Sequence, residues 1–188
     1  DLEKVCEHIH LPLQSGSTRI LSLMNRKYSY DDYFRKVESL RKEIPGIAIT
    51  SDIIAGFPQE TDEDHRETLR ALGEVGFDGI FAFKYSPRPH TKAALMEGHL
   101  PEAVKSERLA EILALQDSMT DERNRIREGS IQEVLVEGQR EDGSEGFQGR
   151  TRTNKIVTLP SSGCRVGQIL SVRIEKAHRH TLEAVPLP

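Results

Sequence analysis

Residues 47–64, IAITSDIIAGFPQETDED, decide the fold class of this chain. The run from Ile47 to Ala55 is rich in apolar and β-branched residues on both faces, as is typical of a strand covered on both sides. The strand ends at the turn residues 56–58, and Thr61 with Asp64 three positions later has the spacing of a capping box at a helix start. Strand, turn and capped helix indicate one βα unit.

Two similar units flank this one, about 30 residues apart along the chain. Such spacing favours parallel strands with helical crossovers, and therefore an α/β architecture. A long polar helix follows a proline-rich loop and stops at Gly129. The predicted strands of this part are residues 7–14, 47–55 and 79–85, and the predicted helices lie around residues 20–24, 29–44, 61–73 and 102–127.

After Gly129 the sequence pattern changes to short runs of strand-forming residues, separated by Gly, Ser and Asp. These runs are residues 131–136, 149–153, 156–159, 168–176 and 181–185. Five short strands suit a small closed or partly open barrel of the oligonucleotide-binding (OB-like) kind. We therefore expect two domains, with residues 1–128 forming the α/β part and residues 129–188 the β-barrel.

Composition limits the class of protein. Hydrophobic residues make up 36% and charged residues 30% of the chain, and no apolar run approaches the roughly 20 residues that a membrane-spanning helix needs. We expect a soluble protein with no membrane partner. The two cysteines, Cys6 and Cys164, have no metal-binding or disulfide-scaffold spacing, which favours a reducing cytoplasm and predicts no metal site. The chain begins without Met in a segment that soon becomes apolar, so we expect it to be cut from a longer protein.

Polar residues follow the first two predicted strands, where parallel α/β folds place their ligand-binding loops. Gln14 ends the first strand, with Ser15 and Ser17 after it; Asp52 lies in the second strand, with Gly56 directly after that strand. A glycine there lets a ligand approach the backbone, and free helix N–H groups suit an anion. The alternative is structural, since serines can cap a helix and Glu60 can complement its dipole. For the histidines at positions 8 and 10, packing is favoured over metal binding because no third ligand is evident.

The third strand ends at Tyr85-Ser86-Pro87-Arg88-Pro89. The Tyr85 ring and the Arg88 guanidinium could hold a nucleobase and an anionic group. The alternative is a rigid, proline-braced loop with a solvated Arg88.

A basic strip lies in the predicted barrel, at residues 149–155, GRTRTNKIV in its wider context. Arg150 and Arg152 would share one face of a strand. From residue 129 onward there are eight Lys and Arg against seven acidic residues, whereas residues 1–128 have 18 against 23. Because the whole chain has a net charge of −4, any contact with nucleic acid must be local. The strip could follow a phosphate backbone with Phe147 stacking on a base; the alternative is a solvated edge strand protected by its charges.

Four blocks, taken in order, resemble the MiaB-like radical S-adenosylmethionine (SAM) methylthiotransferases. They are HIHLPLQSGSTRILSLMNRKYS (8–29), SDIIAGFPQET (51–61), FKYSPRPHTKAA (83–94) and GRTRTNKIV (149–157). The last lies in a region similar to the TRAM RNA-binding module. The resemblance covers essentially the whole chain and is specific because all four blocks occur in the right order.

The resemblance implies the later strands of a radical SAM βα barrel with a linking helix over residues 1–128, and a five-stranded TRAM barrel over residues 129–188. Family members bind SAM and two [4Fe-4S] iron–sulfur clusters, one through a CxxxCxxC loop. None of those cysteines is present in the 188 residues. We therefore expect the full-length protein to be a transferase for tRNA modification and this chain alone to be inactive.

Within the family, the QSGS block and the YSPRPxT block look like the branch that transfers a methylthio group to C2 of isopentenyladenosine beside the anticodon. Pro12 and the SPRP stretch favour this branch over the one acting on threonylcarbamoyladenosine. Two positions depart from the family pattern, since Gln59 and His90 stand where glycine is usual. Both could alter loop shape without changing the chemistry.

The resemblance implies binding roles and no catalytic acid or base in this segment. The cofactor candidates are Gln14, Ser15, Ser17, Asp52 and Gly56, the substrate candidates are Tyr85 and Arg88, and the candidates for binding the tRNA anticodon stem-loop are Arg150, Arg152, Asn154 and Lys155. The competing hypothesis is a stand-alone RNA-binding protein with a non-catalytic α/β scaffold. A partial barrel would also expose strand edges, so we expect self-association.

Overall fold

A computed structural model describes residues 4–187 of the chain, which divide into two compact units. Residues 9–118 form an α/β unit, and residues 119–187 together with residues 4–8 form a β-barrel unit. None of the described helices is long and apolar enough to cross a membrane. The TRAM-like boundary expected near residue 128 falls in the turns that follow the last helix.

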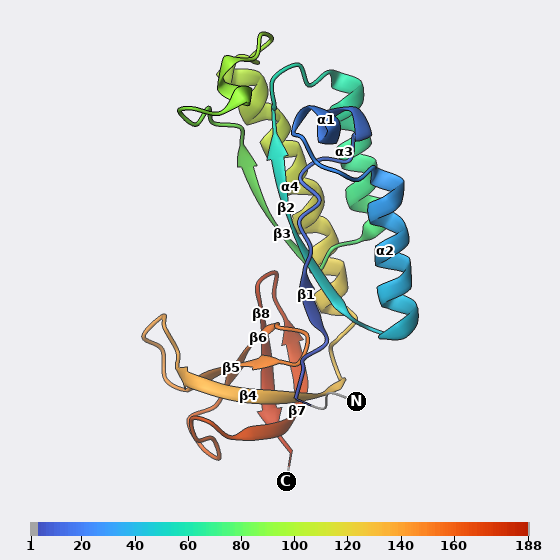
Figure 1. Cartoon of the computed structure of the whole chain (residues 1–188). Coiled ribbons are helices and arrows are strands. Elements are labelled where there is room, and N and C mark those ends of the chain that lie inside the picture. Colours follow the sequence, from blue (N-terminus) through green and yellow to red (C-terminus); the bar gives the residue numbers. More distant parts are fainter. Residues whose placement is uncertain (1–3, 188) are drawn as a thin grey trace. The chain divides into compact units, whose positions relative to one another are not determined.

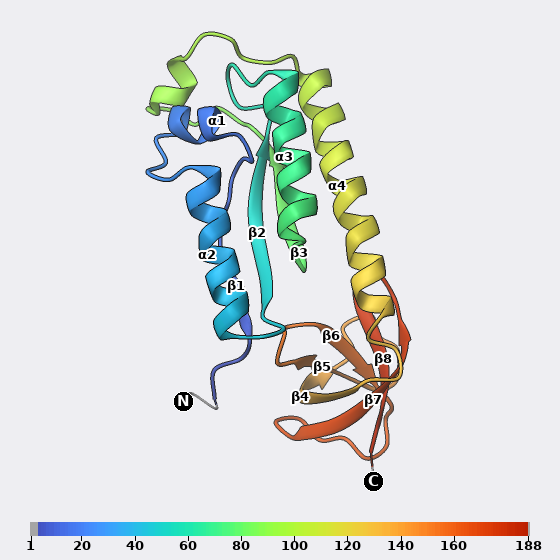
Figure 2. The ribbon, with the colours of Figure 1, turned by 90° about the vertical axis from the view of Figure 1, so that its right-hand side faces the viewer.

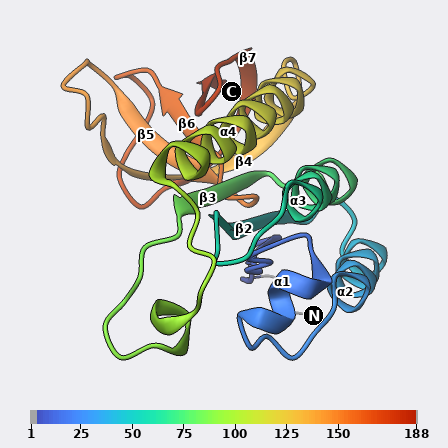
Figure 3. The same ribbon diagram turned by 90° about the horizontal axis from the view of Figure 1, so that it is seen from above.

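The α/β unit holds a three-stranded sheet of order β1-β2-β3, with β2 and β3 parallel. Figures 2 and 3 show α2, α3 and α4 along one side of this sheet. The α/β class predicted from the sequence is confirmed. The elements in chain order are β1 (His8–His10), α1 (Thr18–Leu23), α2 (Tyr30–Glu43), β2 (Ala48–Ala55), α3 (Asp62–Val75), β3 (Gly79–Lys84), the 3-10 helix η1 (Lys92–Leu95) and α4 (Glu102–Arg125).

The core of the α/β unit lies between the sheet and its helices. Ile49 and Ile53 of β2 are fully buried, as is Leu72 of α3. Ile112 of α4 and Val37 of α2 complete the same cluster. Residues 49 and 53 lie on one face of β2, since side chains alternate along a strand. The opposite face of β2 is therefore left for the candidate site.

Both predicted capping boxes are present. Ser29 and Asp32 bond reciprocally at the start of α2, and Thr61 and Asp64 do the same at the start of α3. The helix α3 runs past the expected end at Gly73 to Val75, and a left-handed Gly76 terminates it.

The extent predicted for the first strand, residues 7–14, is wrong. The strand β1 stops at His10, and only Gln14 forms a further, isolated parallel bridge, with Ile53 of β2. Pro12 has no N–H to donate to a strand ladder, which interrupts regular pairing between these two places.

The second unit is a closed barrel of order β4-β5-β6-β8-β7 (Figure 1). The β6–β8 pair is parallel and the other pairs are antiparallel. Closure confirms the predicted five-stranded barrel. It overturns the edge-strand interpretation of the basic strip, because β5 pairs with both β4 and β6. The strands are β4 (Ile131–Gln139), β5 (Phe147–Thr151), β6 (Ile156–Leu159), β7 (Ile169–Ala177) and β8 (Thr181–Pro186).

Candidate functional site

The open face of the sheet presents a polar pair, His10 from β1 and Asp52 from β2. The His10 Nε2 lies 3.4 Å from the Asp52 carboxylate, and its Nδ1 lies 3.0 Å from the Thr50 hydroxyl. Phe81, paired with Asp52 in the ladder, contacts the His10 ring edge-on at 6.0 Å between centroids and is 60% exposed. Asp52, one of the five residues predicted to bind a cofactor, has its side chain on this face.

Ser15 and Ser17, in the loop that leads to α1, turn their side chains toward α3 instead. The Ser17 hydroxyl donates to Asp64 at 2.6 Å, and the Ser15 hydroxyl lies 3.3 Å from that of Thr68. Gln14, in a left-handed conformation with φ of 75°, is buried. These contacts give Ser15 and Ser17 a structural role, while their contact with a cofactor stays a prediction.

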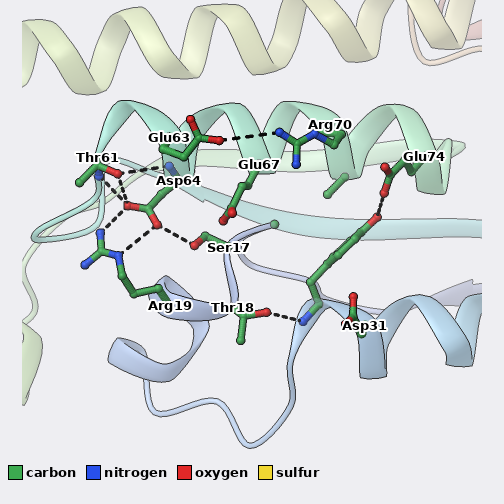
Figure 4. Close-up of a pocket in the computed structure, with 13 residues that line it drawn as sticks. Ser17, Thr18, Arg19, Asp31, Thr61, Glu63, Asp64, Glu67, Arg70 and Glu74 are labelled. Carbon is green, nitrogen blue, oxygen red and sulfur yellow. Dashed lines mark hydrogen bonds and ion pairs between the residues drawn. The ribbon is translucent and has the colours of Figure 1, made fainter.

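Asp64 is the centre of this contact (Figure 4). It accepts hydrogen bonds from Thr61 at the helix start, from Ser17 and from Arg19. Burial alone raises the pKa of Asp64, but the bonds from Arg19, Ser17 and Thr61 outweigh it and hold that pKa below its ordinary value of 3.8. Asp64 is therefore ionised and closes the QSGS loop onto α3.

A hollow of about 610 Å³ opens beside Asp64, between α1, α2 and α3 (Figure 4). Its acidic lining residues outnumber its two arginines, Arg19 and Arg70. Such a lining repels phosphate groups, so this hollow does not fit an RNA backbone. The acidic residues are Asp31, Glu63, Asp64, Glu67 and Glu74.

The turn after β2 is fixed by a buried ion pair from α4. Arg108 donates to the Glu60 carboxylate at 2.7 Å and to Asp62 at 2.6 Å, and Glu60 accepts from the Gly56 N–H at 3.0 Å. Burial raises the pKa of Glu60, while its bonds with Arg108 and Gly56 oppose that effect. Removing one partner of such a pair typically costs about 3–5 kcal/mol of stability.

Gly56 itself is left-handed, with φ of 76°, and the stem of Lys105 lies where a Cβ would stand. The space beside this glycine is therefore filled by α4. That Gly56 contacts a cofactor stays a prediction.

Tyr85 and Arg88, the predicted substrate residues, have different environments. The Tyr85 ring lies between Phe57 and His99, at centroid distances of 5.1 and 5.8 Å. Its hydroxyl is buried with no hydrogen-bond partner within the described part of the chain, and burial raises the pKa of this phenol. Arg88 is exposed in the following loop.

The four predicted RNA-binding residues lie on and next to β5 of the barrel. Arg150 bonds Glu137 at 3.1 Å and the Asn154 side chain at 3.1 Å. Arg152 forms a two-pronged ion pair with Glu7 at 2.7 and 2.9 Å. Asn154 occupies a left-handed turn position with φ of 62°, and Lys155 begins the return toward β6.

The strand β5 ends at Thr151, so Arg152 lies in the turn that follows and the predicted strand register of Arg150 and Arg152 is wrong. Arg150, Arg152 and Asn154 nevertheless line one hollow of about 700 Å³. Its other walls include Leu135 and Ile169, which are 43% and 61% exposed. Phe147 packs against the barrel core instead of lining this hollow. The surface thus combines cations with apolar patches.

Three groups that organise these sites could not be predicted from the local sequence. They are His10 as the partner of Asp52, Arg108 as the partner of Glu60, and Glu7 as the partner of Arg152. Each pair joins residues more than 40 positions apart, so local pattern gave no signal for it. Among the described residues, no group of three or more His, Cys, Asp or Glu could hold a metal ion.

Comparison with known families gives two matches. The Radical SAM superfamily model matches residues 1–72, and the TRAM domain model matches residues 125–187. Both domain types predicted from the sequence are therefore confirmed.

Three relatives are each named tRNA-2-methylthio-N(6)-dimethylallyladenosine synthase. The protein from Thermodesulfovibrio yellowstonii is 59% identical over 97% of this chain and 42% of its own length. Those from Syntrophus aciditrophicus and Aquifex aeolicus are 50% and 43% identical over 97% of the chain, covering 40% and 41% of their own lengths. The chain thus spans about two fifths of the length of these relatives.

Proposed function

The chain belongs to the MiaB-like radical SAM methylthiotransferases, and on that premise we propose that it is part of a tRNA 2-methylthio-N(6)-dimethylallyladenosine synthase. In that enzyme it supplies the later strands of the radical SAM barrel and the tRNA-binding domain. The observation behind this proposal is identity of 59% over 97% of the chain to a protein of that name. The adjacent radical SAM and TRAM matches support it.

The cofactors of the complete enzyme are SAM and two [4Fe-4S] clusters in this proposal. The two cysteines of the chain provide no CxxxCxxC motif, so the cluster ligands must come from elsewhere in a complete enzyme. When bound, SAM and its cluster supply the radical that removes hydrogen from C2 of the modified adenine.

In this proposal the residues of this chain bind the cofactor and the substrate and hold them in position. Asp52, oriented by His10, faces the open side of the sheet and can accept hydrogen bonds from hydroxyl or amino groups of the cofactor. Phe81 offers an exposed ring beside them. The open face thus fits a polar ligand that also has a flat, apolar part.

Substrate tRNA is bound by the barrel in this proposal, through the anticodon stem-loop. Arg150 and Arg152 would contact phosphates, with Asn154 and Lys155 at the adjoining turn. The local excess of basic residues on this barrel supports the assignment. We further propose a cytoplasmic protein, in keeping with its free thiols at Cys6 and Cys164.

The test is a chimaera. Residues 1–188 replace the matching part of the Thermodesulfovibrio yellowstonii synthase, and the chimaera is expressed in cells that lack 2-methylthio modification. Mass spectrometry of tRNA nucleosides should then detect 2-methylthio-N(6)-dimethylallyladenosine. A soluble chimaera with its clusters intact and no modified nucleoside would contradict the proposal. The chain expressed alone is the negative control.

A further inference from the structure

The basic face of the barrel already holds a carboxylate from its own unit. The guanidinium of Arg152 donates from Nε to one oxygen of Glu7 at 2.7 Å and from Nη2 to the other at 2.9 Å. The same Nη2 donates to the Val5 carbonyl at 2.8 Å. A Glu133 carboxylate lies 3.6 Å from Nη1. Residues 5–7 therefore occupy the outward edge of this guanidinium.

This arrangement is the one in which arginine binds phosphate. Two parallel N–H···O bonds in a fork are common to arginine–carboxylate and arginine–phosphate pairs. The bond from Arg152 lowers the pKa of Glu7, so the carboxylate is charged at neutral pH. Glu7 thus presents to Arg152 the charge and the two oxygens that a phosphodiester would present.

Space for a ligand lies beside the ion pair. Residues Lys4, Val5, Cys6 and His8 form one wall of the hollow of about 700 Å³, and the outer faces of β4, β5 and β7 form the others. That volume is within the range of about 300–1,000 Å³ usual for ligand sites. A nucleotide next to Arg152 could therefore place its base or sugar against Leu135 and Ile169.

We propose that Glu7 is an internal competitor for RNA, occupying on Arg152 the position of an RNA phosphate and leaving when RNA binds. The inference rests on the proposed binding of RNA by this barrel. Release of Glu7 also frees the Val5 carbonyl from Arg152, so the segment of residues 4–8 detaches from the face that RNA occupies.

The competition is modest in size. The side chains of Arg152 and Glu7 are 35% and 36% exposed, and ion pairs at such positions are weakened by water and salt. Removing the competitor should therefore tighten RNA binding by about two- to fivefold. Weakly held RNA would be disfavoured, while RNA that contacts the whole face displaces Glu7 readily.

The experiment measures the binding of a fluorescein-labelled anticodon stem-loop RNA by anisotropy in low and moderate salt. Glu7→Gln removes the competing charge and keeps the side-chain shape. The matched control is Glu145→Gln, which makes the same charge change in an exposed loop of the same barrel and away from Arg152. Circular dichroism verifies that each variant is folded.

We expect Glu7→Gln to bind two to five times more tightly than the wild type, and Glu145→Gln to change binding less than twofold. In an Arg152→Ala background the gain from Glu7→Gln should fall to that of the control, since no guanidinium remains to compete for. Equal effects of the two Gln variants, or an undiminished gain without Arg152, would overturn the competitor while leaving RNA binding intact. If the wild type binds no RNA, or if Arg150→Ala and Arg152→Ala leave its binding unchanged, the proposed RNA surface itself is wrong.

Discussion

Two residues, Gln59 and His90, adopt the left-handed backbone conformation that favours glycine. Their φ angles are 67° and 65°, and these are the two positions where the resembling family usually has glycine. The substitutions therefore leave the loops in the glycine-like conformation, at a cost in backbone strain. The loop shape is retained because neighbouring contacts impose it, such as the bond from the Gln59 N–H to the Gly98 carbonyl at 2.8 Å.

His90→Gly should therefore stabilise the chain. The substitution relieves about 1–2 kcal/mol of backbone strain in the folded state. It also raises the entropy of the unfolded chain, which costs about 0.5–1 kcal/mol of stability. The free energy of unfolding should therefore rise by about 0.5–1 kcal/mol. His180→Gly, at an exposed histidine with ordinary φ, should destabilise the chain by the entropy alone. Urea unfolding of both variants measures this, and a loss of stability in His90→Gly would refute the strain.

Asp64 should give the chain an acid-sensitive contribution to stability. A group whose pKa is lower in the folded state stabilises the fold above its unfolded value and loses that effect as pH falls through the folded value. Here the loss begins near the ordinary value of 3.8. The stability difference between the wild type and Asp64→Asn should be about 1–3 kcal/mol at pH 7 and should shrink at pH 3. The comparison variant is Asp31→Asn, at an exposed site in the first turn of α2. If the stability difference between the wild type and Asp64→Asn does not change with pH, the prediction is contradicted.

The orientations of Ser15 and Ser17 were beyond sequence analysis, although their place after a strand was predictable. The pattern of residues 14–17 fits a ligand loop and a helix cap equally well. Their partners, Thr68 and Asp64, are about 50 residues away and become neighbours only when α3 packs on the loop. The identity of a turn is local information, but the direction of its side chains is not.

Among the elements, α3 packs closely against the loop that precedes α1. A Cβ on Gly16 would lie 2.6 Å from the Cα of Thr68, so the loop approaches the α3 backbone directly. Gly73, in the same helix, has open space around it. The two glycines thus differ in what their missing side chains allow.

Gly16→Ala should destabilise the chain by about 1–3 kcal/mol through overpacking against α3. Gly73→Ala should stabilise it by about 0.5–1 kcal/mol, because alanine favours a helix interior. Thermal unfolding of the two variants checks the opposite signs. A stabilised Gly16→Ala variant would show that the close approach to α3 is not present in solution.

Element types were predictable where the signal is local. The capping boxes at Ser29 and Thr61 follow from residues three apart, and the five barrel strands follow from alternating runs between turns. The end of β1 and the pairing of β5 on both sides depend on partners distant in sequence. The prediction for β1 was therefore wrong in its extent. The alternative of an edge strand for β5 was wrong as well.

At the scale of the whole chain, the open face of the sheet predicts self-association. Phe81 and Phe83 of β3 are 60% and 57% exposed, and neighbouring exposed aromatic residues favour contact between molecules. Replacing both with lysine should shift the chain toward monomer in sedimentation velocity runs. Val166→Lys, at a barrel residue of 61% exposure, serves as the control. A wild-type chain that is monomeric at all concentrations would contradict the prediction.

The order of the barrel strands has a consequence for synthesis on the ribosome. Although β8 is made last of the five, it lies between β6 and β7, which are made earlier. The ring therefore stays open, with two unpaired edges, until residues 181–186 have left the exit tunnel. A nascent chain paused after β7 has emerged and before β8 has emerged should expose those edges to chaperones or to neighbouring chains. The barrel that carries the basic face of β5 closes only after β8 has inserted.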